Sequence, residues 1–288
     1  MTIFFLFLWY FFSGDTMKKE IVLLLLFMCS CFFVISLLTK EEDAIVVQEE
    51  DRGIFISYIE LGNYLRYKDK KEAKEVIQSM VSNIDDAGFN MVLLQVRTFS
   101  DSFYSSDIYP WSAVISGEEG VNPGYDLLKV FLNCCHKKDM KLFAWINPYR
   151  IRGDSDVSDL SVDNPAYSYL GTDTVFVSGG VYYNPAKEEV KQLIVDGVLE
   201  LVSNYDVDGV LFDDYFYPSG DVDVVDFQNY QEENPGTSIE EFRLMQVNDL
   251  IERVYKVCHK HDVLFAVSPD GNIDNNYQKH YADVKKWG

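Results

Sequence analysis

The chain has 288 residues, of which 48% are hydrophobic and 15% aromatic, enough for one large globular domain. It carries 25 basic and 46 acidic residues, a net charge of −21. This charge argues against nucleic acid or an anionic membrane surface as a binding partner, because both attract basic patches. A soluble acidic surface that resists self-association is its simplest explanation.

Residues 1–40 are predicted to be a signal peptide or membrane anchor. Lys18 and Lys19 precede the eighteen uncharged residues 21–38, and a strongly polar run follows. Cys31 is a candidate lipid attachment site, although the apolar run continues seven residues beyond it, which fits an uncleaved anchor equally well. In either case the following domain is expected to be exported to the cell envelope or extracellular space, attached to the membrane through this segment or a lipid.

The basic pair also indicates an alternative start. Met17 directly precedes Lys18, so the mature reading frame is expected to begin there. The earlier apolar stretch, residues 3–12, has no positive flank, and ten residues are too few to cross a bilayer. A second spanning helix in this stretch is the less favoured alternative.

An acidic linker over residues 41–51 leads into a single predicted domain, residues 52–288, in which strand and helix patterns alternate. Strands are predicted at 53–57, 90–96, 141–146, 209–212 and 264–268. Helices are predicted over 72–84 and 126–137, from Pro185 with Asn184 as N-cap, and from the capping-box spacing of Ser238 and Glu241 to about residue 260.

Several of these strands are apolar throughout and end in polar and aromatic residues. Such strands are typical of a parallel sheet that is buried on both faces. A weak repeat, 135–144 echoed by 258–266, supports two βα units of the same build. It places His136, His259 and His261 at the opposite end, where helix C-terminal capping is their expected role.

The predicted fold class is α/β, a (β/α)8 TIM barrel with about five of its eight βα units present. An eight-stranded barrel cannot close with five strands, and an open edge of fully apolar strands would aggregate. The alternatives are a fragment of a longer barrel, which we favour, or a smaller doubly wound sheet that is complete in five strands.

No cofactor or resident metal is predicted. Cys134, Cys135 and Cys258 lack the spacing of a metal knuckle and are too few for a disulfide framework, and buried free thiols are expected at Cys134 and Cys258. The sequence contains no glycine-rich phosphate loop and no histidine-rich cluster. A hard cation held by Asp213, Asp214 and Asn147 is a weaker alternative.

Carboxylates at the strand ends suggest glycosidic bond hydrolysis, which usually takes one carboxylic acid and one carboxylate. Asp213 shares a strand face with Leu211 and is assigned as nucleophile or base. Asp214 would accept hydrogen bonds from loop amides or orient a neighbour. Alternatively, the two aspartates only cap the next segment. Asp270 is the candidate general acid. It could instead be a turn residue, with the acid in strands beyond this sequence.

Other side chains at the strand ends suit a sugar ligand. Polar groups for sugar hydroxyls are predicted at Gln95, Arg97, Asn147 and Tyr149. Arg97 could equally belong to a structural ion pair, in which it would lower the pKa of the neighbouring carboxyl. Flat faces for pyranose rings are predicted at Tyr104, Trp111, Trp145, Tyr215 and Tyr217, with ordinary core packing as the alternative.

The ordered motifs of the domain resemble the glycosyl-hydrolase-like 10 family of extracellular TIM-barrel proteins, formerly a domain of unknown function. The resemblance covers about residues 52–288. It rests on RGIFIS at 52–57, QVR at 95–97, FY at 103–104, YPWS at 109–112, GEEG at 117–120, AWINPYR at 144–150, YYNP at 182–185, DGVLFDDYFYP at 208–218, VSP at 267–269 and YADVKKW at 281–287. In the family a strand-rich stretch follows the position of Trp287.

The resemblance implies hydrolysis of extracellular or cell-wall polysaccharide, with peptidoglycan glycan strands as a substrate. Two rival functions stay open. One is a carbohydrate-binding pseudoenzyme with the same cleft and no competent acid. The other is a cell-surface interaction domain. The sugar, its linkage, the stereochemical outcome and the oligomeric state are not predicted.

Overall fold

The computed structural model describes residues 27, 50–213, 217–218 and 221–287. The chain divides into two compact units, residues 1–50 and 51–288. The predicted export segment belongs to the first unit and, apart from Phe27, lies outside the described residues. Within the described part of the chain, no helix combines the length and apolarity needed to cross a membrane.

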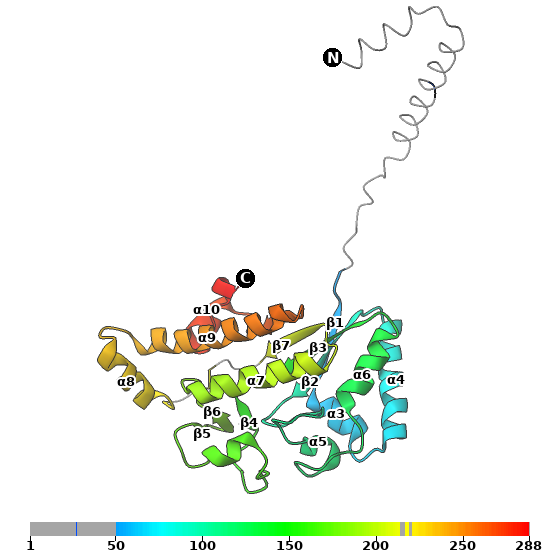
Figure 1. The fold of residues 1–288 in the computed structure, drawn as a ribbon, viewed down its shortest axis with the longest axis horizontal. Helices are drawn as coiled ribbons and strands as arrows, with labels where there is room; N and C mark the ends of the chain where they lie inside the picture. The colour runs from blue at the N-terminus through cyan, green and yellow to red at the C-terminus, as the bar shows by residue number, and fades with distance from the viewer. Residues whose placement is uncertain (1–26, 28–49, 214–216, 219–220, 288) are drawn as a thin grey trace, which may run out of the picture. The chain divides into compact units, whose positions relative to one another are not determined.

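The second unit is built on one five-stranded parallel sheet, whose strands follow each other in chain order (Figure 1). All five strands were predicted to within one residue at each end. They are β1 (Gly53–Ile56), β2 (Met91–Arg97), β3 (Lys141–Ile146), β7 (Gly209–Asp213) and β8 (Leu264–Ser268).

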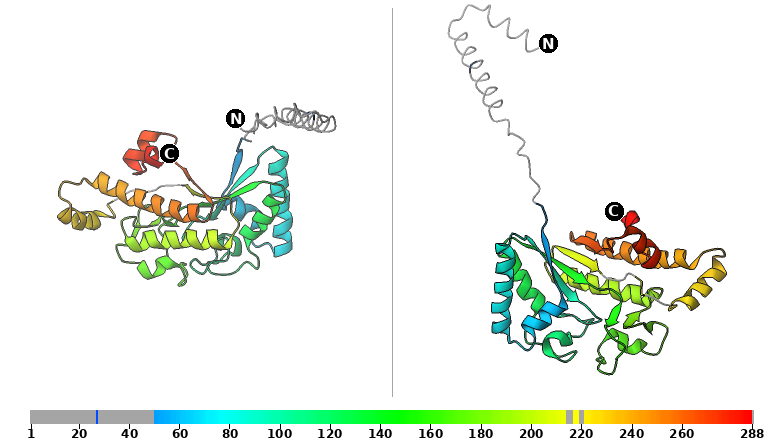
Figure 2. Two further views of the ribbon diagram at one scale, coloured as in Figure 1. Left: turned by 45° about the horizontal axis from the view of Figure 1, so that its top comes forward. Right: turned by 180° about the vertical axis from the view of Figure 1, so that it is seen from behind.

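The crossover helices indicate how the sheet is wound. They are α3 (Tyr58–Leu65), α4 (Lys70–Asp86), α6 (Leu127–His136), α7 (Glu188–Asn204) and α9 (Ile239–Lys260). Each connection leads from one strand to its immediate neighbour, always in the same direction across the sheet. Right-handed crossovers therefore place all of these helices on one face of the sheet (Figure 2). A doubly wound sheet reverses its strand order and covers both faces, so that alternative is wrong. The five strands form an open sheet and not a closed barrel.

The two faces of the sheet differ in burial accordingly. The helix-covered face is fully buried along the central strands, through Val92, Leu94, Val96, Leu142, Ala144, Ile146, Val210 and Phe212. On the other face, Phe55 of edge strand β1 is 48% exposed and Leu264 of edge strand β8 is 57% exposed. The prediction of strands buried on both faces therefore holds for the central strands and fails at both edges.

Helix ends follow the local sequence in most places. The capping box of α9 is present, because Ser238 Oγ accepts from the Glu241 amide and the Glu241 carboxylate accepts from the Ser238 amide. The predicted N-cap of α7 is wrong. That helix begins at Glu188 with Lys187 in the cap position, and Asn184 instead ties neighbouring loops together, with its side-chain amide donating to the carbonyl of Asp173.

A second sheet and several short helices were not predicted. Strands β4 (Arg150–Arg152), β6 (Val181–Tyr183) and β5 (Val175–Val177) pair antiparallel in the order β4-β6-β5 between β3 and α7, and η1 (Pro165–Tyr169) lies among them. The remaining helices are α5 (Ala113–Ser116), α8 (Val224–Glu233), α10 (Ile273–Lys279) and α11 (Val284–Trp287). Strands of three residues are too short to show periodicity, because alternation needs four or more positions.

The three cysteines of this unit are free, and the predicted burial holds for Cys258 but is wrong for Cys134, which is half-buried. Cys135 and Cys258 are buried, and burial raises the pKa of each thiol to about 12. Both are therefore protonated packing residues at neutral pH.

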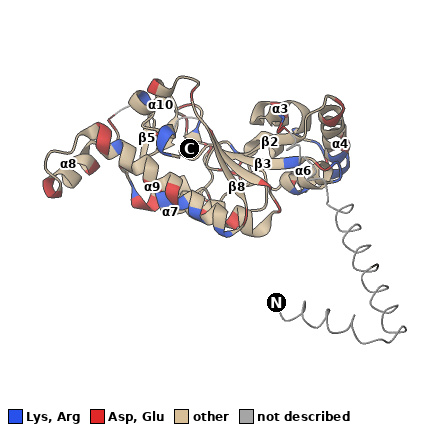
Figure 3. Ribbon diagram, turned by 90° about the horizontal axis from the view of Figure 1, so that it is seen from above, with Lys and Arg blue, Asp and Glu red and all other residues tan. Residues whose placement is uncertain are grey.

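Charges of both signs alternate along α7 and α9 (Figure 3). Between these helices Lys191 is 6% exposed, and its Nζ lies 2.8 Å from an Asp249 carboxylate oxygen. Arg253 forms ion pairs with Glu188 and Asp249. These pairs hold α9 against α7.

Candidate functional site at the carboxyl end of the sheet

Gln95 and Asn147 meet where β2 and β3 end. The Gln95 Nε2 donates to the Asn147 Oδ1 at 3.2 Å, and the Gln95 Oε1 accepts from the Tyr58 amide at 2.9 Å. Both side chains are at most 3% exposed. The two predicted amides are therefore brought together, and Gln95 links the ends of β1, β2 and β3.

Asp213 ends the neighbouring strand β7. Its preceding residue Phe212 pairs with Ile146, the residue before Asn147, so Asp213 and Asn147 hold equivalent positions on adjacent strands. On its other side Asp213 pairs with Ser268 of β8. Asp213 is half-buried. Strand alternation places it on the face of Leu211, which the helices leave uncovered.

Arg97 does not lie with these residues, contrary to its predicted role in sugar binding. The pairing of β2 with β3 shifts between Gln95 and Arg97, so that Arg97 lies opposite Ile146 on the helix-covered face. Its guanidinium is 4.5 Å from the centre of the Tyr109 ring, and the residue is 2% exposed. The alternative ion pair is also wrong, because within the described part of the chain both terminal nitrogens of this guanidinium are buried without a hydrogen-bond partner.

Three predicted aromatic or polar contacts for sugar are buried instead. Tyr104, Tyr149 and Tyr217 are each at most 2% exposed. Tyr104 packs edge-on against Tyr205 with ring centres 5.3 Å apart, and burial raises the pKa of the Tyr149 phenol above its usual range. A ring without exposed surface offers no face to a pyranose, so Tyr104 and Tyr217 take the alternative role of core packing. Hydrogen bonding of Tyr149 to a sugar hydroxyl stays a prediction.

Trp145 and Trp111 keep part of their surface. Trp145 is half-buried, lies between Gln95 and Leu211 in the sheet register, and meets Phe55 edge-on with ring centres 5.3 Å apart. Trp111 is half-buried in the loop after β2, where its backbone pairs with Ser102. A sugar-stacking role stays a prediction for both.

The predicted general acid Asp270 follows β8 and is exposed. One carboxylate oxygen accepts from the Asn272 amide at 2.8 Å, and the other lies 3.9 Å from the His280 Nε2. The first contact is typical of an aspartate that stabilises a turn. His280 was not singled out in the sequence, since only the structure brings it back toward the end of β8. Asp214 and Tyr215 lie outside the described residues.

A buried carboxyl cluster beyond β2 was also missed. Asp101 is 1% exposed, and burial raises the pKa of its carboxyl to about 6. The Glu119 carboxylate contributes to this raised pKa, while the hydrogen bond to Ser112 and the charge of Arg152, which pairs with Glu119 at 3.2 Å, partly offset it. The sequence signal was an aspartate among the small polar residues that follow a buried strand. It gave no indication that the side chain is enclosed.

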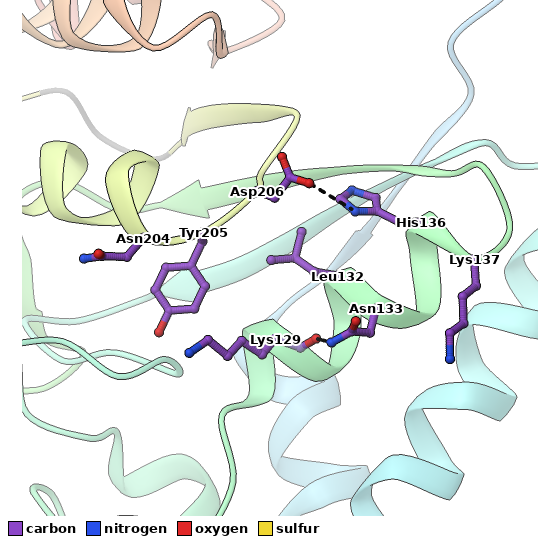
Figure 4. Close-up of a pocket in the computed structure, with 8 residues that line it drawn as sticks. All are labelled: Lys129, Leu132, Asn133, His136, Lys137, Asn204, Tyr205 and Asp206. Carbon is purple, nitrogen blue, oxygen red and sulfur yellow. Dashed lines mark hydrogen bonds and ion pairs between the residues drawn. The ribbon is translucent and has the colours of Figure 1, made fainter.

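The surface hollow in Figure 4 lies elsewhere, between α6 and the end of α7. It has a volume of about 400 Å³ and is lined by Lys129, Leu132, Asn133, His136, Lys137, Asn204, Tyr205 and Asp206. His136 faces it from the turn that enters β3, at the predicted end of the sheet, and its Nε2 lies 3.1 Å from the Asp208 carboxylate. This hollow is remote in topology from Gln95, Asn147 and Asp213. In barrel proteins this end serves stability.

No group of three or more histidine, cysteine, aspartate or glutamate side chains suited to a metal ion occurs among the residues that the structure describes. The cation alternative that included Asp214 lies partly outside those residues.

The sequence of this domain matches a known protein family. Residues 50–288 match the family described as Glycosyl hydrolase-like 10. The chain belongs to this family. The resemblance inferred from the sequence motifs is thereby confirmed.

Relatives in this glycosyl hydrolase-like 10 family carry hydrolase names. The chain is 33% identical over 241 residues to glycosyl hydrolase YngK of Bacillus subtilis (strain 168), which covers 75% of this chain and 47% of YngK. It is 33% identical over 239 residues to glycosyl hydrolase DigH of Escherichia coli (strain K12), covering 73% of this chain and 54% of DigH. The chain thus spans about half the length of these relatives.

Solved structures with a similar fold are glycosidases. The α-L-fucosidase isoenzyme 2 from Paenibacillus thiaminolyticus superposes with a TM-score of 0.52 at 12% identity, covering 76% of this chain and 32% of that one. The glycoside hydrolase domain of PgaB (BpsB) from Bordetella bronchiseptica gives 0.51 at 13% identity, covering 76% and 65%. At such identities these matches show the fold alone.

Proposed function

We propose that this glycosyl hydrolase-like 10 chain carries a glycoside hydrolase site at the carboxyl end of its sheet, and that its substrate is extracellular or cell-wall polysaccharide such as peptidoglycan glycan strands. The observation that carries the proposal is the convergence of Gln95, Asn147 and Asp213 on adjacent strand ends. A carboxylate beside buried amides suits a sugar, because the amides orient hydroxyl groups while the carboxylate acts on the anomeric carbon or on water.

The proposal also concerns the architecture. We take the five βα units as part of an eight-unit barrel, because all of them wind in one direction and the face opposite the helices carries Asp213 and Trp145. In such barrels the active site is built from the loops that follow the strands. The glycosidase folds that superpose on the chain support this assignment.

In the proposed reaction Asp213 is the nucleophile or base, and Trp145 packs against a pyranose ring. Asp214, next in sequence, would orient a neighbour. A second carboxyl group must protonate the leaving oxygen. Asp270 is the sequence candidate for this group. It would have to leave the turn in which it accepts from the Asn272 amide.

That turn favours a second candidate function, a carbohydrate-binding protein without hydrolysis. If Asp270 only stabilises its loop, the site keeps the sugar contacts and lacks an acid from β8. Such a protein would bind glycan strands and release no reducing ends.

The test measures both binding and release of reducing ends from purified peptidoglycan glycan strands by the full chain. Turnover that is abolished in Asp213→Asn, with binding and melting temperature retained, supports the hydrolase. The matched control is Asp163→Asn, an exposed aspartate on the loop before η1, which is expected to behave as wild type. Equal turnover in Asp213→Asn would remove the assignment of Asp213. Binding with no turnover in the wild type would establish the second candidate.

We also propose that the domain is exported and held at the membrane by residues 21–38 or by a lipid on Cys31. The supporting observation is the uncharged run after Lys18 and Lys19. Fractionation of cells that express the full chain is expected to place it in the envelope, and Cys31→Ala separates lipid attachment from an intact anchor. Recovery of the wild-type chain in the cytosol would contradict export.

A further inference from the structure

The loop that follows Asp213 is fastened by a buried ionic cluster. Asp223, at the start of α8, is fully buried, and both of its carboxylate oxygens accept from Arg243 of α9, at 2.6 Å from one terminal nitrogen and 2.8 Å from Nε. The same carboxylate accepts from the Tyr217 hydroxyl at 2.5 Å. The hydrogen bonds that Arg243 donates to Asp223 raise the pKa of its guanidinium further above an already high value, so Arg243 stays charged. Bidentate pairs of this kind fix geometry as well as charge.

A second tyrosine completes the cluster. The Tyr281 hydroxyl accepts from the other terminal nitrogen of Arg243 at 3.0 Å. The guanidinium lies 5.4 Å from the Tyr217 ring centre and 5.2 Å from the Tyr281 ring centre, and the two rings meet edge-on at 5.3 Å. The cluster thus joins Tyr217, in the loop after β7, to the first turns of α9 and to the segment after α10.

The far end of the same loop is held independently. The side-chain amide of Asn184 donates to an Asp226 carboxylate oxygen at 2.9 Å, and the Lys187 Nζ donates to the other oxygen at 2.9 Å. Two anchors on Asp223 and Asp226 therefore fix the beginning of α8 against α9 and against the start of α7.

The chain distance from this cluster to Asp213 is short. Only four Cα–Cα steps separate Asp213 from Tyr217, which limits their separation to about 15 Å. Both ends of that segment are fixed, one by strand pairing with Ser268 and the other by the Tyr217 hydroxyl. The cluster therefore holds Tyr217 at a point that is within this distance of Asp213.

We propose that the Asp223–Arg243 pair, together with Tyr217 and Tyr281, is a positioning unit that sets the orientation of the Asp213 carboxylate toward a bound glycan. None of the four residues needs to touch the sugar. The proposal rests on the function proposed above for Asp213, and it adds the residues that hold this group in place.

The primary test variant is Arg243→Lys in the full chain, which keeps the positive charge and removes the planar fork. Its matched control is Arg253→Lys on the same helix, where the arginine pairs with Glu188 and Asp249 instead. Tyr281→Phe is the milder second variant, since it removes one hydroxyl and keeps the ring, and it replaces Arg243→Lys if that variant does not fold.

Two measurements decide the proposal without requiring turnover. Amide exchange over residues 221–227 is expected to accelerate about tenfold or more in Arg243→Lys and to stay unchanged in Arg253→Lys. The carbon resonance of the Asp213 carboxyl is expected to titrate at a different pH in Arg243→Lys only, because its surroundings change with the loop. An unaltered Asp213 titration, despite faster exchange, would reduce the cluster to a structural role and overturn the proposal.

Turnover of glycan strands provides the third measurement. Arg243→Lys is expected to lower kcat about tenfold to a hundredfold with a smaller change in KM, as misplacement of a reacting group does. If the wild type shows no turnover, the hydrolase proposal fails while the Asp213 titration still decides the positioning role. A wild-type kcat in a folded Arg243→Lys variant would contradict the positioning role.

Discussion

Asp101→Asn is expected to stabilise the protein at neutral pH. The Asp101 carboxyl is 1% exposed, and burial raises its pKa from 3.8 to about 6. The charged form is therefore disfavoured in the folded state, and the difference corresponds to a penalty of about 3 kcal/mol at pH 7. Asparagine is similar in shape to the protonated acid and keeps an oxygen that can accept from the Ser112 hydroxyl.

The contribution of Asp101 to folding stability changes with pH in one direction. Because its pKa is raised on folding, Asp101 binds protons more tightly in the folded than in the unfolded state. Its contribution to stability therefore falls as the pH rises from about 4 to about 6 and stays low above that range. Other carboxyls, such as Glu188 with its lowered pKa, contribute with the opposite sign at lower pH. The difference between variant and wild type isolates the effect of Asp101.

Urea unfolding followed by tryptophan fluorescence at pH 4 and pH 7.5 measures this difference. The two proteins are expected to be nearly equal at pH 4, and the variant to be more stable by about 3 kcal/mol at pH 7.5. For a domain of this size each kcal/mol shifts Tm by about 2–4 °C. Asp163→Asn, which changes an exposed aspartate, is the control. A difference between wild type and Asp101→Asn that does not change with pH would refute the reasoning.

Two further substitutions test the packing on the helix-covered face. Arg97→Met is expected to keep the free energy of unfolding within about 1 kcal/mol of wild type, or to raise it, because it replaces an enclosed cation by an apolar chain of similar length. Glycan binding by this variant is also expected to persist. Loss of binding would restore Arg97 as a sugar contact. Gly197→Ala in α7 is expected to lower Tm, because the added Cβ would lie 2.6 Å from a Tyr109 ring carbon. Overpacking costs about 1–3 kcal/mol, which exceeds the stabilisation of about 1 kcal/mol from the higher helix propensity of alanine. A raised Tm in thermal denaturation would show that the Tyr109 ring can move aside at little energetic cost.

Much of the fold could be predicted because buried parallel strands are apolar at nearly every position. All five strands of the main sheet and the capping box at Ser238 follow from such local patterns. The small sheet β4-β6-β5 could not be predicted, since its strands of three residues are held by pairing across a long insertion. The convergence of Gln95 with Asn147 was predictable from strand ends alone.

The amino-acid sequence by itself determined the strands of the main sheet, its longer helices, the family and the grouping of amides with Asp213, because each of these depends on local periodicity or ordered motifs. The tertiary structure decided which side each polar group faces. A register shift of one residue turns Arg97 onto the helix-covered face, and core packing encloses the rings of Tyr104 and Tyr217. It also encloses the carboxylates of Asp101 and Asp223. Such placements depend on contacts between residues far apart in the chain, and no local pattern records them.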